Sequence, residues 1–217
     1  MISRRVSIVG TAMIALSASS IAGNHPAALP PLLPEAEEIQ SALEGAPAHL
    51  RERAGVFVLK STGYVRARET RNGFTCLLVR EWSRSFEPTC FDAEGTASIL
   101  PVILFRTEQV ANGTSDAGIR AAVAEGYRTG KFRAPQRVGV AYMLSKRNIV
   151  VLDHETKKVG GAPPHLMFYS PYMSAEDFGT TADFASHFGV ADEGTPTAMI
   201  IVPVELGGAE HAHKSDP

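Results

Sequence analysis

His165 is the residue of this chain whose type and setting are best suited to chemistry. It follows Pro163 and Pro164, which stiffen the approach, and it opens the apolar run 166–169. A neutral imidazole at the polar end of a strand can act as a general base or as a ligand. A core histidine that is hydrogen-bonded to a backbone carbonyl has the same sequence pattern. Both interpretations of His165 therefore stay open at the level of sequence.

Aromatic and methionine side chains cluster in two segments near this histidine. Such side chains line adaptable apolar pockets, and they also fill ordinary cores. If the chain binds a small apolar molecule, we expect the pocket where the segment around Tyr142, residues 165–172 and the acidic excursion 174–196 meet. The excursion is long and rich in glycine, as a lid would be, although a structural loop explains it equally well. The predicted ligand-binding residues are Tyr142, Met167, Tyr169 and Tyr172.

An enzyme built on His165 would also need an acid to orient the imidazole ring. Asp177 and Asp183 lie in the excursion, and catalytic triads assemble from residues that are far apart in sequence. Such an enzyme would be a small hydrolase or lyase with His165 as the catalytic general base. No set of catalytic residues converges within the sequence itself, so we expect a non-catalytic binding or structural domain instead.

Cys76 and Cys90 are the two cysteines of the chain. A bridge between them would close a loop of about 15 residues and contribute roughly 3 kcal/mol of stability in the chain-entropy model. A nucleophilic cysteine needs a base or a helix N-terminus to lower its pKa, whereas Cys76 lies in the middle of an apolar strand. The pattern predicts a disulfide, with a pair of inert thiols or a nucleophile as the alternatives.

The glycine-rich segment 126–131 lacks the features of a phosphate-binding loop. It is one residue short between its glycines, it has Phe132 where a Ser or Thr would bind magnesium, and it ends a helix instead of opening one. His211 and His213 could hold a divalent metal in the tail, but no clustered Cys/His pattern predicts a metal site. The sequence therefore indicates neither a metal nor an identifiable cofactor.

Residues 1–22 have the form of a secretory signal. Two arginines supply the positive region, an apolar run follows, and small residues precede a cleavage site after Ala22. The arginine pair is also typical of twin-arginine signals, although Ser7 stands where those carry a large apolar residue. The apolar run is too short to span a bilayer comfortably, which disfavours an uncleaved anchor. We expect an exported protein, either periplasmic or secreted.

Removal of the signal changes the formal net charge from −2 to −4, because the segment carries two arginines and no acids. A mildly acidic surface argues against nucleic acid or anionic lipid as a partner. The rest of the chain has no second apolar segment of membrane length, so no integral membrane span is expected in the mature chain. The oligomeric state is not indicated by the sequence.

About 195 residues follow the signal, which is enough for one sizeable domain. We interpret residues 23–33 as an extended tether, 34–204 as a single domain and 205–217 as a flexible tail. A helical insertion over 92–130 separates two groups of strands, which favours an α+β fold over a regular βαβ alternation. We predict one antiparallel or mixed sheet of about six strands with helices packed on it.

The Asn72-Gly73 pair is the strongest local turn signal. Between two extended runs it favours a type I′ turn, which would pair residues 64–69 with 74–81 in a three-stranded meander. The second of these strands is apolar on both faces, so it should be covered on both sides.

Capping and turn chemistry predict further boundaries. Asp92 and Ser115 are predicted to be N-caps of helices. Residues 138–145 and 148–152 are predicted to form either a hairpin or two consecutive strands.

Overall fold

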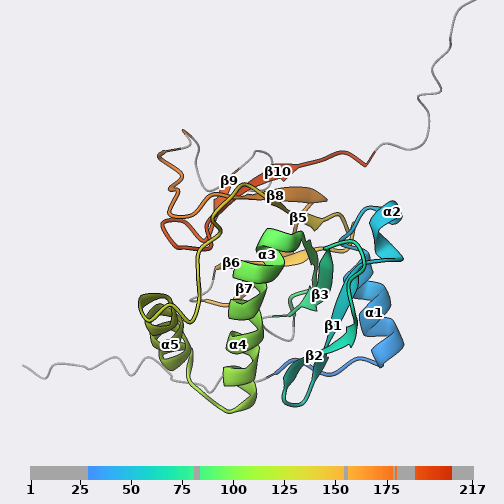
Figure 1. Cartoon of the computed structure of the whole chain (residues 1–217), viewed down its shortest axis with the longest axis horizontal. Coiled ribbons are helices and arrows are strands. Elements are labelled where there is room, and N and C mark those ends of the chain that lie inside the picture. The colour runs from blue at the N-terminus through green and yellow to red at the C-terminus, as the bar shows by residue number, and fades with distance from the viewer. Residues whose placement is uncertain (1–28, 81–83, 154–155, 178, 180–188, 207–217) are drawn as a thin grey trace, which may run out of the picture.

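The computed structural model describes residues 29–80, 84–153, 156–177, 179 and 189–206 (Figure 1). The predicted signal peptide, residues 23–28 of the tether and residues 207–217 of the tail lie outside these residues, as do Asp183, His211 and His213. The helices are α1 Glu35–Leu43, α2 Ala48–Arg51, α3 Ala93–Ser98, α4 Leu100–Ala111 and α5 Asp116–Arg128. The strands are β1 Gly55–Lys60, β2 Gly63–Arg68, β3 Thr75–Val79, β4 Glu87–Phe91, β5 Val140–Met143, β6 Ile149–Asp153, β7 Lys158–Gly161, β8 His165–Tyr169, β9 Gly189–Ala191 and β10 Met199–Pro203.

Eight of these strands form one mixed sheet in the order β2-β1-β3-β4-β5-β8-β10-β9, and β6 and β7 form a separate two-stranded sheet. Strands β1 and β3 are parallel neighbours, and the other neighbouring pairs are antiparallel. The α+β class with a mixed sheet is confirmed, but the predicted number of about six strands is wrong. Strand β4 was hidden by Pro88, since proline is rare inside sheets. Within the described ranges, β5 pairs with Cys90 and Phe91 of β4, and Pro88 has a strand neighbour on the β3 side alone, opposite Leu78.

The predicted meander around Asn72-Gly73 is wrong. Strand β2 is at the edge of the described sheet and pairs with β1, and β3 lies on the other side of β1, with Gly55 opposite Thr75 and Val56 opposite Cys76. A type I′ turn requires positive φ at both central residues, but only Gly73 has it, at 80°. The chain returns across the end of β1 instead, and the Gly55 amide donates to the Phe74 carbonyl.

The sheet is covered on both faces, as the apolar pattern of β3 predicts. One face carries a core of Val56, Val58, Cys76, Leu78 and Cys90 against Ala42 of helix α1. The opposite face carries Phe57, Leu77, Phe91 and Tyr169 against Ile99 and Leu100. Figure 1 shows α1 and α4 on opposite sides of strands β1 and β3.

The helical insertion between β4 and β5 consists of α3, α4 and α5. Both predicted caps are confirmed, since the Asp92 carboxylate accepts from the Gly95 amide and the Ser115 hydroxyl accepts from the Gly118 amide. The alternative of a hairpin after residue 138 is wrong, because β5 and β6 belong to different sheets. Within the described ranges, every helix is too short or too polar to cross a bilayer.

Candidate functional site

His165 begins strand β8, opposite Met143 of β5 and Pro203 of β10. Only 4% of its surface is exposed, and its Nδ1 lies 2.7 Å from the Pro163 carbonyl oxygen. An Nδ1–H that donates to this carbonyl leaves the lone pair on Nε2. Burial lowers the pKa of His165 below its usual value, more strongly than the carbonyl contact raises it. The ring is therefore a neutral imidazole. Among the described residues, its hydrogen bond is the structural one to the Pro163 carbonyl.

Asn148 shares this buried polar corner. Its Nδ2 donates to the Met143 carbonyl at 3.0 Å and lies 3.5 Å from the Pro163 carbonyl. These bonds connect the start of β6 to the last residue of β5 and to the segment just before β8. Within the described part of the chain, no group of three or more His, Cys, Asp or Glu residues could hold a metal ion.

Wild type should lose free energy of unfolding in mild acid because of His165, and replacement of His165 by glutamine should remove this pH dependence. The folded-state pKa of His165 is depressed, so protonation favours the unfolded chain. The contribution of this histidine is fully present above the unfolded-state pKa of about 6.5 and is lost as the pH falls below it. We expect His165→Gln to cost about 1–3 kcal/mol near neutral pH by disturbing a buried hydrogen bond, and the cost should shrink toward about pH 5.

Urea denaturation of wild type and variant at several pH values measures this difference. His49 is exposed, so His49→Gln is the matched control and should leave the pH profile unchanged. A difference between wild type and His165→Gln that stays constant with pH would contradict the expectation.

The four residues predicted to bind a ligand do not converge on one site. Met167 and Tyr169 are buried in the core on the α4 side of the sheet. Tyr142 lies on the opposite face, with its ring centroid 5.8 Å from that of Phe74. Tyr172 is 62% exposed. Alternation along the strands separates Tyr142 from Met167 and Tyr169, because a side chain and its next neighbour in a strand point to opposite faces, and Tyr172 lies beyond the end of β8.

Tyr169 takes part in a polar network at the start of α3. Its hydroxyl donates to Asp92 Oδ1 at 3.0 Å, and Asp92 Oδ2 accepts from the Val140 amide at 3.1 Å. Burial, and next the nearby Asp92 carboxylate, raise the pKa of Tyr169, so its hydroxyl stays a donor. A Cβ at Gly95 or at Gly139 would collide with this network. Such close packing suits a structural network more than an accessible reaction centre.

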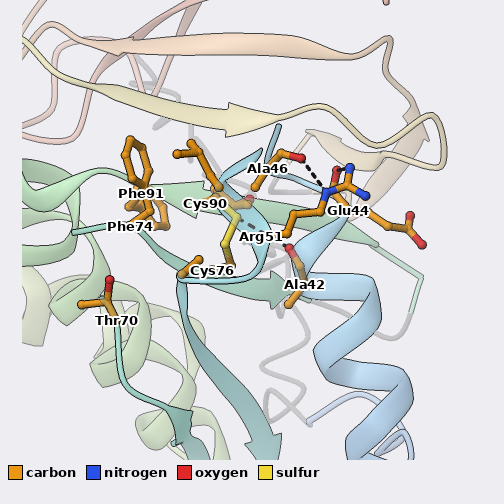
Figure 2. Close-up of a disulfide and its surroundings, with 12 residues drawn as sticks. Ala42, Glu44, Ala46, Arg51, Thr70, Phe74, Cys76, Cys90 and Phe91 are labelled. Atoms are coloured by element: carbon orange, nitrogen blue, oxygen red, sulfur yellow. Dashed lines mark hydrogen bonds between the residues drawn. A yellow bond between two sulfur atoms is a disulfide. The ribbon is translucent and has the colours of Figure 1, made fainter. Parts of the chain in front are cut away.

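The predicted disulfide between Cys76 and Cys90 is confirmed. The two cysteines face each other on the neighbouring strands β3 and β4, and both are fully buried. Figure 2 shows the bridge beside the end of α1, where the Cys90 sulfur lies 3.8 Å from the Ala42 carbonyl oxygen. The helix end approaches closely because residue 45 is glycine; a Cβ there would collide with the Pro88 carbonyl. The bridged sulfurs provide no thiolate for nucleophilic chemistry.

A groove of about 600 Å³ lies elsewhere on the molecule, between α4, the turn that joins β1 to β2, and the segment that follows α5. Its lining is mixed: aromatic and aliphatic side chains lie next to polar groups, which include a cation and a carboxylate. Its lining includes Tyr64, Leu104, Phe105, Glu108, Lys131 and Phe132.

Glycines position the walls of this groove. Gly63 has a φ of 115° and brings the β1–β2 turn against α4, where its Cβ would lie 3.4 Å from the Glu108 backbone. Gly130 has a φ of 76° and ends α5. The chain then folds back, and the Phe132 amide donates to the Gly126 carbonyl at 3.0 Å. This turn seats the Phe132 ring on α5 and leaves Lys131 exposed beside the groove.

Lys131 differs from the other basic residues of its segment. Residues 128–137 contain four cations and no acid. Three of the cations are ion-paired with Glu94 or Glu125, whereas Lys131 has no carboxylate partner among the described residues. Its Nζ lies 3.9 Å from the centroid of the Phe105 ring and 5.3 Å from that of Phe132. The rings hold the ammonium in place by cation–π attraction and leave its charge available to an anion.

Sequence reasoning missed this groove. Its components come from residues 62–64, from one face of α4 and from residues 131–132, which are far apart in the chain. The available signal was the basic segment 128–137 with aromatic Phe132 inside it, but a single segment does not reveal its neighbours.

Comparison of the chain with protein-family models, with curated proteins and with solved structures finds no match.

Proposed function

We propose that this protein is an exported, non-catalytic binding protein, and that its ligand is a small molecule with an apolar body and a carboxylate. The observation that carries the proposal is the ammonium of Lys131, which is held over the Phe105 ring beside a groove with apolar and polar lining and has no carboxylate partner among the described residues. Binding sites for small molecules are typically apolar concavities of this size with a few placed polar groups.

The groove supplies both parts of such recognition. The half-buried Leu104 and Phe105 offer apolar and aromatic surface to the body of the ligand, and the buried Phe132 packs beneath this surface. Lys131 offers a cation to its carboxylate, and a charge-assisted bond of this kind is stronger than a neutral one. Glu108 lies beside the same groove and disfavours ligands that carry several negative charges.

Two further observations support the parts of the proposal that concern export and the absence of catalysis. A disulfide between buried cysteines is typical of proteins that fold in an oxidising compartment, outside the cytoplasm. His165 binds a backbone carbonyl, which supports a structural role over that of a general base in a hydrolase or lyase.

Heteronuclear NMR titration tests the ligand class with two probes of similar shape and opposite charge, hydrocinnamate and phenethylamine. We expect hydrocinnamate to bind more tightly, with shifts centred on Phe105 and Lys131. Lys131→Gln should weaken hydrocinnamate binding by about threefold to tenfold, because the ion pair is partly exposed.

Lys146→Gln is the matched control, since Lys146 is also an exposed lysine but lies in the loop between β5 and β6. Equal affinities for the two probes, or an equal loss in the two lysine variants, would contradict the proposal.

A further inference from the structure

The chain contains two Asn-Gly pairs, Asn72-Gly73 and Asn112-Gly113. In such a pair the backbone nitrogen of the glycine can attack the side-chain carbonyl carbon of the asparagine, because the glycine has no Cβ to hinder the approach. The reaction requires the asparagine side chain to rotate toward this nitrogen. Both asparagines are followed by glycine, although the outer neighbours differ (Arg71 and Phe74 in one pair, Ala111 and Thr114 in the other), so the fold is the main source of any large difference in their reactivity.

The side chain of Asn72 is held by three hydrogen bonds. Its Oδ1 accepts from the Phe74 amide at 3.1 Å and from the Thr70 hydroxyl at 3.3 Å. Its Nδ2 donates to the Leu50 carbonyl at 2.9 Å. Rotation toward Gly73 would break these bonds in a half-buried place, so the fold protects this asparagine.

Asn112 is in the opposite situation. It is exposed at the C-terminal end of α4, and its side chain has no hydrogen bond to any described residue. A Cβ placed on Gly113 would meet nothing within 4 Å, so the space around the pair is open. The Gly113 amide donates to the Val110 carbonyl at 3.0 Å. This bond belongs to the last turn of the helix, which opens far more easily than the core.

We propose that Asn112 is a site of spontaneous chemical modification in the folded protein, and that Asn72 is not. The Gly113 nitrogen forms a bond to Asn112 Cγ, the bond from Cγ to Nδ2 breaks, and ammonia leaves with the proton of the Gly113 amide. Water then opens the resulting succinimide at either carbonyl and produces aspartate or isoaspartate. The product carries a new negative charge at the C-terminal end of α4, where the helix dipole disfavours it.

Incubation of the intact folded protein at mildly alkaline pH, followed by reduction and rapid tryptic digestion, tests this proposal by mass spectrometry. The two pairs fall in separate tryptic peptides, residues 107–120 and residues 72–80. We expect conversion at Asn112 to be at least about tenfold faster than at Asn72, because three side-chain hydrogen bonds restrain only the latter.

The same protein, reduced and unfolded in urea, is the control for intrinsic reactivity. There the two asparagines should convert at similar rates, since both precede glycine. Asn112→Gln should abolish the slow appearance of the more acidic form of the folded protein. Equal rates in the folded protein, or faster conversion at Asn72, would overturn the proposal.

Discussion

Replacement of Arg80 by methionine is expected to lower the free energy of unfolding by about 3–5 kcal/mol, because it leaves a buried carboxylate without its counter-ion. The side chains of Arg80 and Glu38 are 6% and 1% exposed, and they form an ion pair at 2.7 Å beneath α1. Among the described residues, the other Glu38 oxygen accepts a single long bond, at 3.4 Å, from the Leu59 amide. Arg80 also donates to the Pro31 carbonyl, so its loss frees the segment that leads into α1.

The deficit of Arg80→Met should be smaller in mild acid than at neutral pH. Burial raises the pKa of Glu38 while Arg80 opposes that rise, so removal of Arg80 raises the pKa further. A folded-state pKa above the unfolded value means that stability is lost as the pH rises past the unfolded pKa of about 4.3, and that it returns as the pH falls.

Urea denaturation of three variants at two pH values measures this effect. Lys60→Met is the control, since Lys60 also joins the sheet to α1 through an ion pair with Glu35 but both partners are exposed; it should cost no more than about 1 kcal/mol. The double variant Glu38→Gln/Arg80→Met should recover part of the loss. A deficit of Arg80→Met no larger than that of Lys60→Met would contradict the expectation.

Loss of the Cys76–Cys90 bridge is expected to cost about 3 kcal/mol, since the cross-link closes a short loop and restricts the unfolded chain. Burial of both cysteines also predicts that reductant acts slowly on the folded protein and quickly in urea.

Three forms of the protein separate the cross-link from the packing of the sulfurs. Reduced wild type keeps the sulfur atoms and loses the bond, while Cys76→Ala/Cys90→Ala loses both and should be somewhat less stable than the reduced protein. Calorimetry or urea denaturation compares them with the oxidised protein. If oxidised and reduced wild type had the same stability, the bridge would have no stabilising role.

Features that depend on residues close together in the chain, or on residue type alone, could be predicted from the sequence. The caps at Asp92 and Ser115 were predictable because a capping side chain bonds to an amide a few residues along the chain. The covering of β3 on both faces was predictable because alternate positions of one strand must each meet a neighbouring layer. The pairing of Cys76 with Cys90 followed from their being the two cysteines of the chain.

Relations between distant segments were decided only by the tertiary structure. The turn signal at Asn72-Gly73 favoured pairing of β3 with the preceding strand β2. Instead β3 pairs in parallel with β1, and no local sequence pattern predicts this pairing. The sequence predicted that the segments of His165 and Tyr142 meet at one pocket. In the structure β5 and β8 are neighbours, but their register places these two side chains on opposite faces of the sheet. The groove also depends on how distant segments pack. Lys131 lies over Phe105 because α5 folds back on α4, and neither residue's local sequence predicts this contact.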